Sequence, residues 1–279
     1  MRRACILVFA AAGLLAAHLP RQAFAQSIWM TREGKHADML EFILPAEDDD
    51  ADALTGALFV SGRTALSHSL TFVDQVPFAR YSAPGRVFYN YTINDFVTAD
   101  VNESMVGNIY LGIEGTPATG RIFGEGGVRL PLASDRKPFA ASMGAEADLR
   151  RLQAFSPKTV CIESALNVRS SPESRTTYRF RISPILEFDT DRATSHIVTN
   201  YSGQVGYQRP SLRVGGAISG RANFTNDGYS VLDQNLVQLE FHSDFLSGPF
   251  RPGIDVRVPL GTWSESAGTV VGANFTWVR

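Results

Sequence analysis

From Asn235 to Leu246 the sequence reads NLVQLEFHSDFL, and apolar and polar residues alternate almost without interruption. One side of an extended chain carries Val237, Leu239, Phe241 and Phe245. The opposite side carries Gln238, Glu240, His242 and Asp244. A period of two residues predicts a β-strand with one apolar face and one charged face. This stretch alone fits either a soluble sandwich with water outside or a barrel with water inside.

The first residues of the chain favour export from the cytoplasm. Arg2 and Arg3 precede an apolar run from 4 to 17, and the small-residue motif Ala23-Phe24-Ala25 follows. This order predicts a secretory signal peptide, 1–25, that is cleaved before Gln26. The apolar run is shorter than a membrane-spanning helix requires, although an uncleaved anchor is the alternative. The remainder divides into a periplasmic N-terminal segment, 26–37, and one large domain, 38–279.

Charge and cysteine content narrow the classes of partner and of fold. Cleavage would remove three arginines and no acidic residue, so the formal net charge would change from −2 to −5. A mildly acidic chain is not expected to bind nucleic acid. Cys161 is the single cysteine after residue 25, so the exported domain must fold without an internal disulfide.

The alternation that marks the opening stretch recurs along the chain. Stretches with this pattern are 38–44, 54–61, 65–80, 106–114, 120–131, 158–168, 174–188, 196–207, 211–224, 253–260 and 270–279. Together with 235–246 they predict about twelve strands. The stretch 144–155, GAEADLRRLQAF, is the exception, because its pattern is helical and it lies in a connection.

The predicted connections alternate in length. The short connections are 62–64, 115–119, 169–175, 208–210 and 247–251. The longer connections are 45–53, 81–105, 132–157, 189–195, 225–235 and 261–268. Short turns at one end and long loops at the other are typical of outer-membrane barrels and are not expected of a soluble sandwich.

Strand length favours the same fold. Tyr178 and Phe188 share one face of a strand, and a tilted strand of that length spans about 25 Å, the height of a lipid-facing band between aromatic girdles. We therefore predict an all-β fold, a transmembrane antiparallel up-and-down β-barrel of about twelve strands, with a short helix in one extracellular loop. We expect it to be a monomer in the outer membrane of a Gram-negative bacterium. Its final residue, Arg279, is unusual, since such barrels end on an aromatic residue.

The charged face of each strand should then line the lumen. Twelve strands enclose less space than a general porin, so the lumen should be narrow, and its arginines should favour anionic or polar-headed solutes. Salt bridges that brace the lumen are the alternative role for these side chains. Candidate substrate-binding residues are Arg121, Arg129, Arg179, Arg181, Arg213, Arg221, Glu240, His242, Asp244 and Arg257. The connections 81–105 and 132–157 should shape the outer mouth, as a lid or as an apolar entrance.

Two motifs resemble a known family. The chain reads Val106-Gly107-Asn108-Ile109-Tyr110-Leu111-Gly112 and then Gly127-Val128-Arg129-Leu130-Pro131 before the helical insert. This arrangement resembles the bacterial outer-membrane barrels of the MetA-pathway of phenol degradation, or putative transporters, although Ile109 replaces their usual proline. The resemblance implies a passive outer-membrane channel for aromatic or other hydrophobic small molecules. It implies no fixed set of binding residues.

Other functions are less well supported by the sequence. It contains no phosphate-binding glycine loop and no histidines at metal-ligand spacing, so no catalytic residue, cofactor or metal is predicted. A structural or adhesive barrel with an occluded lumen is one alternative. A lipid hydrolase is another, but His68-Ser69 and His242-Ser243 are neighbours that point to opposite faces of a strand. The expected partners are membrane lipid and lipopolysaccharide, the barrel-assembly machinery and a small-molecule solute.

Overall fold

The computed structural model describes residues 36–46, 55–90, 95–115, 121–171, 174–224, 235–246, 248–261 and 268–278. The predicted signal peptide, 1–25, and nearly all of the predicted periplasmic segment, 26–37, lie outside these residues. The first six strands are β1 (His36–Pro45), β2 (Gly56–Ala65), β3 (Leu70–Asn90), β4 (Asp95–Val106), β5 (Ile109–Gly115) and β6 (Ile122–Leu130). Two helical segments follow, α2 (Pro138–Ala147) and the 3₁₀ helix η1 (Leu149–Phe155). The remaining strands are β7 (Thr159–Arg169), β8 (Thr176–Asp189), β9 (Thr194–Gln208), β10 (Leu212–Asn223), β11 (Leu236–Phe245), β12 (Phe250–Leu260) and β13 (Val270–Val278).

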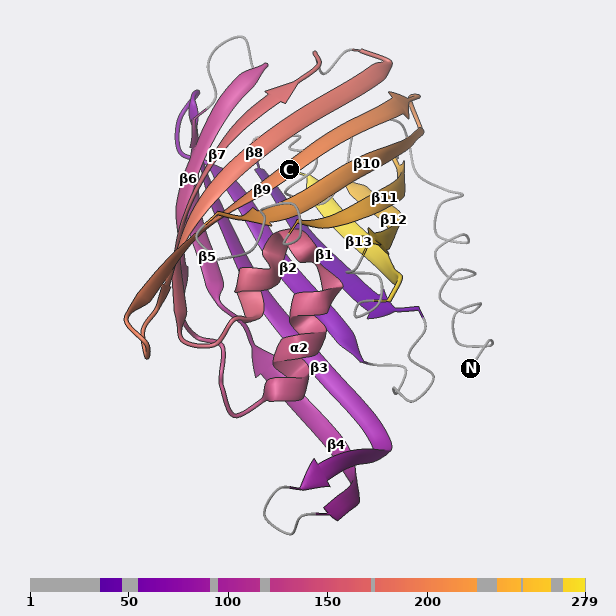
Figure 1. The fold of residues 1–279 in the computed structure, drawn as a ribbon. Helices are drawn as coiled ribbons and strands as arrows, with labels where there is room; N and C mark the ends of the chain where they lie inside the picture. Colours follow the sequence, from indigo (N-terminus) through magenta and orange to yellow (C-terminus); the bar gives the residue numbers. More distant parts are fainter. Residues whose placement is uncertain are drawn as a thin grey trace.

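The strands form one closed antiparallel barrel (Figure 1). Except for β4 and β5, each strand pairs with its neighbours in sequence, and β1 closes the sheet by pairing with β13 from Ala37 opposite Val278 to Pro45 opposite Val270. β4 and β5 together occupy one position in the wall, because both pair with β3, β4 along its second half and β5 along its first. The barrel therefore has twelve strands and one extra, and the predicted fold is confirmed.

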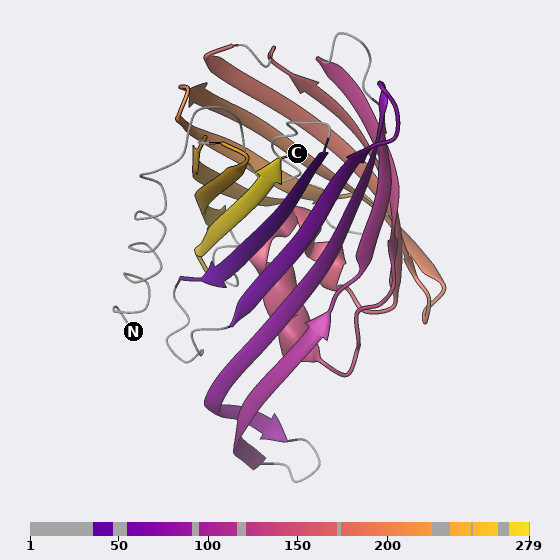
Figure 2. The ribbon, with the colours of Figure 1, turned by 180° about the vertical axis from the view of Figure 1, so that it is seen from behind.

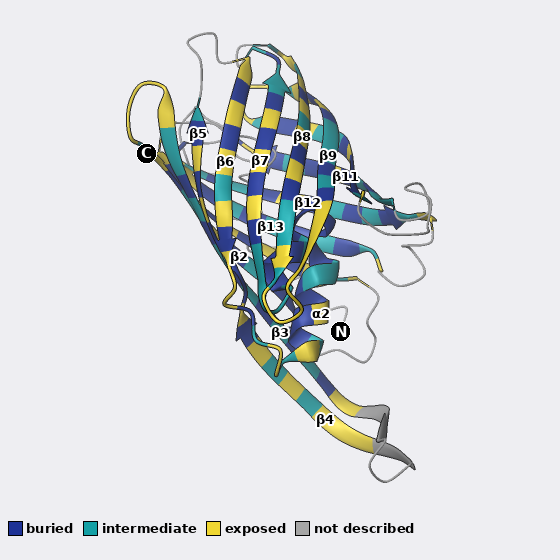
Figure 3. Ribbon diagram, turned by 60° about the vertical axis from the view of Figure 1, so that its left-hand side comes forward, coloured by how far each residue is buried: buried dark blue, intermediate teal, exposed yellow. Residues whose placement is uncertain are grey.

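The distribution of polar and apolar side chains is inverted relative to a soluble protein. Buried and exposed residues alternate along the strands (Figure 3). In β11, Phe241 is 59% exposed while its neighbour Glu240 is 3% exposed. The same alternation continues around the wall, with Phe180, Ile218 and Trp277 on the outside. Arginine is almost never fully buried without a partner, and a wide apolar outer surface suits lipid rather than water. The polar face of the opening stretch therefore points into the barrel.

Two predicted boundaries were wrong. The turn between β2 and β3 is at 66–69 and not at 62–64, because Gly62, Arg63 and Thr64 continue the pairing with β1 and β3. The connection between β8 and β9 is short, since the two strands pair as far as Asp189 opposite Thr194. Pro184 interrupts the β7–β8 pairing, but the register is the same on both sides of it.

The connection 81–105, predicted to be a loop at the mouth, is instead a long hairpin. β3 and β4 stay paired from Phe78 opposite Val106 to Asn90 opposite Asp95, so the hairpin extends well past the rim of the barrel (Figures 1 and 2). The register shifts between Ala83 and Arg86, where Gly85 adopts a φ of 64°. The aromatic residues of this connection, Phe88, Tyr89, Tyr91 and Phe96, lie among residues whose side chains the structure does not describe.

The connection 132–157 also differs from its prediction, because it folds into the barrel rather than over its mouth (Figure 1). The helix begins earlier than predicted, at Pro138, whose fixed φ and missing N–H suit a first helical turn. α2 lies against β1 to β4, and η1 contacts β3 on one side and β10 and β11 on the other. We call residues 138–155 the plug.

Small inward-facing side chains make room for the plug. Near the loop-bearing end of the barrel, Ala57 and Ala79 are buried on the inner wall and face the alanine-rich side of α2. Phe155, at the end of η1, packs edge-on against Phe59 of β2 at 5.7 Å between ring centroids. Apolar residues of the connection are therefore buried by packing against the wall.

Candidate functional site in the barrel lumen

The ten predicted lumen residues fall into two groups. Eight are buried on the inner wall: Arg129, Arg179, Arg213, Arg221, Glu240, His242, Asp244 and Arg257. The side chain of Arg181 is 10% exposed, and it also reaches a buried carboxylate. Arg121 is exposed in the bend that precedes β6, at the end of the barrel where the short turns lie. The structure thus brings nine of the ten together in the lumen, and whether they bind a solute stays a prediction.

The plug is held by a buried network of charges at the centre of the lumen. Arg257 of β12 donates to Glu41 of β1 at 2.6 Å and to Asp148 of the plug at 2.8 Å. Arg151 of η1 lies 2.7 Å from Glu41 and 2.6 Å from Asp148. Both carboxylates are completely buried, and Arg151 and Arg257 contact both of them. β1 and β12, which lie on either side of β13, are therefore joined to each other and to the plug.

Asp148 has a second role at the start of η1. Its carboxylate accepts a hydrogen bond from the backbone N–H of Arg150 at 2.9 Å, which caps the 3₁₀ helix. Burial by itself raises the pKa of Asp148, but the positive charges of Arg151, Arg257 and Arg150 outweigh it, and the pKa lies well below its ordinary value. Asp148 therefore remains ionised and bound while the plug is docked.

Arg150 extends the network to a further strand. Its Nη2 lies 3.1 Å from Oε2 of Glu240 on β11, and its Nε lies 3.5 Å from Asp148. Its backbone carbonyl accepts a hydrogen bond of 2.6 Å from Asn200 of β9. The plug is thus bonded to strands on both sides of the lumen, through side chains and through its own backbone.

Gln153 connects η1 to two further ion pairs. Its amide nitrogen donates to Glu163 at 3.1 Å, and Glu163 accepts from Arg129 at 2.7 Å. Its amide oxygen accepts from Arg221 at 2.9 Å, and Arg221 also donates to Glu187 at 2.5 Å. The neutral amide of Gln153 therefore bonds to a carboxylate and to a guanidinium group of the wall.

The break between β4 and β5 forms the seat for the end of the plug. Between the pairs Phe78–Val106 and Gln75–Tyr110, two residues of β3 oppose three of the β4–β5 strand, so one extra residue makes a bulge at Gly107-Asn108. The backbone N–H of Asn108 donates to Ala154 at 2.6 Å, and its side chain donates to the carbonyls of Gln153 and Ser156. A Cβ at Gly107 would lie 2.3 Å from the carbonyl oxygen of Ala154, so glycine is required.

The other end of the plug is held by the β3–β4 hairpin. Glu103 of β4 accepts hydrogen bonds from the backbone N–H groups of Phe139 and Ala140, at 3.0 and 3.1 Å. A carboxylate at this position satisfies free donors of the first helical turn and complements the helix dipole. Phe139 also stacks on Tyr81 of β3 with 5.6 Å between ring centroids.

Towards the end of the short turns the lumen is filled by the wall itself. Arg63 pairs with Glu114 at 3.1 Å, and Arg181 pairs with Glu125 at 2.6 Å. Other side chains here have neutral partners. Arg179 donates to Asn167, Arg213 donates to Gln208, and His242 lies 3.2 Å from Gln204. The bracing role that the sequence left open is therefore present in the structure.

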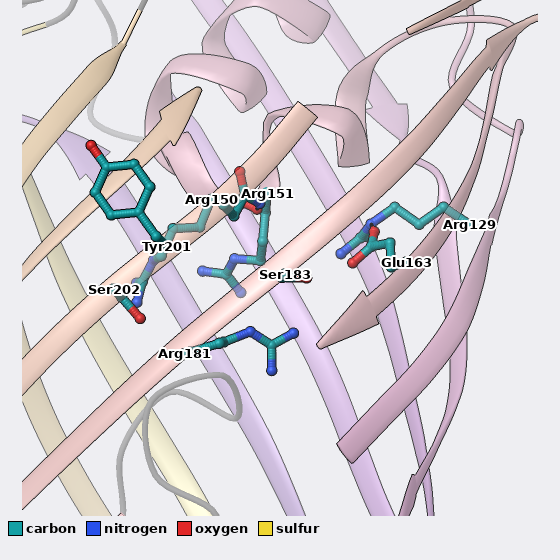
Figure 4. A pocket seen from close by; sticks show the side chains of 9 residues that line it. Arg129, Arg150, Arg151, Glu163, Arg181, Ser183, Tyr201 and Ser202 are labelled. Carbon is teal, nitrogen blue, oxygen red and sulfur yellow. Dashed lines mark hydrogen bonds and ion pairs between the residues drawn. The ribbon is translucent and has the colours of Figure 1, made fainter. Parts of the chain in front are cut away.

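A small cavity remains between η1 and the strands β6 to β9 (Figure 4). Its volume is about 20 Å³, which is room for a single water-sized group. Four arginines line it, Arg129 and Arg181 from the wall and Arg150 and Arg151 from the plug, together with one carboxylate, Glu163. The remaining lining residues are Ser183, Asn200, Tyr201 and Ser202.

Several residues of this site were missed by sequence reasoning. Glu41 was overlooked although its strand alternates, and Asp148, Arg150 and Arg151 were assigned to a solvent-facing loop. The charged motif Asp148-Leu149-Arg150-Arg151 inside an otherwise small and apolar segment is the feature that could have indicated an inward position.

The described residues also bear on metal binding and on hydrolysis. In the described residues no group of three or more His, Cys, Asp or Glu side chains is arranged to hold a metal ion. His242 is buried on the inner face, while Ser243 beside it belongs to the outer face of β11, so they do not form a nucleophile and base. No helix in the described part of the chain is long and apolar enough to cross a membrane.

Comparison with known proteins supports the fold. The structure is similar to the COG4313 outer membrane channel from Pseudomonas putida F1, with a TM-score of 0.60 and 10% identity over 92% of this chain and 100% of that chain. It is also similar to the KdgM porin, with a TM-score of 0.50 and 8% identity over 87% of this chain and 99% of that chain. No family model matches the sequence, and no curated protein matches it. The barrel fold of outer-membrane channels is thus shown, and membership of the phenol-degradation family stays a prediction.

Proposed function

We propose that this protein is a passive outer-membrane channel for small molecules whose plug, residues 138–155, must move before a solute can pass. The observation that supports this proposal is the charge network of Glu41, Asp148, Arg151 and Arg257, which fastens a separate segment across an otherwise polar lumen. A barrel that needed only rigidity could have been filled from its wall, as it is near the short turns.

The composition of the network supports a movable plug. Buried ion pairs gain little net stability over apolar packing, because the cost of removing charges from water nearly offsets their attraction. An undocked plug would return these charges to water, so the docked and undocked states differ less in free energy than the short distances suggest. The neutral and apolar contacts of α2 with the wall hold the segment near its seat.

The family resemblance adds aromatic or other hydrophobic compounds as cargo, and the arginines of the lumen add an anionic group. A small aromatic or aliphatic acid combines both properties. We further propose an exported protein of a Gram-negative outer membrane, in which the apolar outer surface meets lipid.

The test is solute uptake into liposomes that contain either the full chain or a variant in which residues 138–155 are replaced by a short glycine-serine linker. The panel is phenolics, fatty acids, sugars and ions. We expect slow, selective uptake by the full chain and fast, unselective uptake by the variant. If no solute crosses with either protein, while both migrate as folded barrels on unheated gels, the barrel is structural and the channel proposal fails.

A further inference from the structure

We infer that the cavity between η1 and strands β6 to β9 is a subsite for the carboxylate group of a small organic acid, held by Arg150 and Arg181 together with the other arginines that line it. The inference rests on the proposed function, because it assigns a class of solute to the lumen of the same channel.

The arrangement of charges around the cavity favours an anion. Of the four arginines that line it, Arg181, Arg150 and Arg151 have carboxylate partners that are not part of the lining. Those partners are outside the lining, which among the described residues holds four guanidinium groups and one carboxylate, Glu163. Such a lining attracts an anion and repels a cation.

Arg150 supplies an independent observation. Its side chain is 8% exposed, its Nε and Nη2 face Asp148 and Glu240, and its Nη1 has no hydrogen-bond partner among the described residues. A buried charged donor without a partner is costly, and a ligand at this point would satisfy it. Asn200, which also lines the cavity, fixes the backbone of Arg150 by its 2.6 Å hydrogen bond, and Asp148 and Glu240 hold the guanidinium group.

Size and shape select the group. The space of about 20 Å³ has room for one water-sized group, so a solute would place one oxygen of its anionic end there and extend its remaining atoms along the lumen. A carboxylate oxygen accepts charge-assisted hydrogen bonds from guanidinium N–H groups, which are stronger than those between neutral groups. A tetrahedral anion such as sulfate is bulkier than this space.

The test uses ¹³C-formate as the probe and the detergent-solubilised full chain, with formate line width measured by NMR at an ionic strength kept constant with sodium sulfate. We expect saturable broadening. Arg181→Gln should weaken binding by about tenfold or more, the factor that one charge-assisted hydrogen bond supplies. Glu163→Gln should strengthen it, because it removes the carboxylate of the lining. Arg192→Gln, at an exposed outer turn, is the matched control and should have no effect.

Arg181→Gln should weaken formate binding and Glu163→Gln should strengthen it. This difference separates an effect on binding from misfolding, because a damaged barrel cannot bind formate more tightly. Absence of broadening, equal loss in Arg181→Gln and Arg192→Gln, or sulfate competing more strongly than formate would each overturn the subsite. If the chain conducts ions in planar bilayers and binds no formate, the subsite fails and the channel function stands. Formate binding in a chain that never conducts supports the subsite and refutes the channel.

Discussion

Neutralising Asp148 should release the plug. Asp148→Asn keeps the size of the side chain and its ability to cap η1, since asparagine is also a good N-cap residue. It removes the charge that faces Arg151 at 2.6 Å, Arg257 at 2.8 Å and Arg150 at 3.5 Å. The change therefore isolates the electrostatic part of docking from the local stability of the helix.

The expected size follows from the burial of the network. Removing one partner of a buried ion pair costs about 3–5 kcal/mol, because the remaining charge stays buried without compensation. Arg151 and Arg257 keep Glu41 as a partner, so we take the lower figure, about 3 kcal/mol. At 1.4 kcal/mol for each factor of ten, the ratio of undocked to docked plug should rise by about 150-fold.

The assay is single-channel recording in planar bilayers, with the open probability as the measured quantity. Asp135→Asn is the matched control, because Asp135 is a half-exposed carboxylate of the same connection that pairs with Lys158 at 2.8 Å. An exposed pair contributes about 0–1 kcal/mol, so this control should change the open probability little. If folded Asp148→Asn barrels open no more often than the Asp135→Asn control, the charge network does not hold the plug.

Three further predictions concern the pH dependence of the plug, a glycine of the wall and the first turn of α2. The pKa of Asp148 is held below its ordinary value of about 3.9, so the charge of Asp148 should stabilise the docked plug above about pH 4 and stop doing so only as the pH falls further. Conductance should therefore stay constant from about pH 8 to 5 and rise in stronger acid. The Asp148→Asn variant should not show this rise. A Cβ at Gly127 would lie 2.5 Å from the ring of Tyr110, so Gly127→Ala should destabilise the barrel by about 1–3 kcal/mol in urea unfolding, whereas Gly124→Ala, whose nearest atom is 3.9 Å away, should not. Glu103→Gln should weaken the start of α2 by about 0.5–1 kcal/mol and speed proteolysis of the 132–157 connection, and an unchanged cleavage rate would contradict the capping role.

The inward position of nine predicted residues could be read from the sequence because strand alternation is a local property. Arg179 points inward since Tyr178 and Phe180 beside it point outward, and no distant residue is needed to decide this. The same reasoning could not establish what each arginine binds. The prediction that Arg121 lies in the lumen was wrong, because alternation does not show where a strand ends and a turn begins.

The sequence by itself determined the class of fold and the face on which each strand residue lies. Both follow from the alternation of polar and apolar residues, which can be read from neighbouring positions in the chain. Tertiary structure alone decided the position of the plug. Its anchoring contacts join residues far apart in the chain, such as Arg151 with Glu41 and Arg257 with Asp148, and only closure of β13 onto β1 brings them together. The direction in which a charged connection folds depends on these buried partners, so no local pattern predicts that 138–155 turns inward.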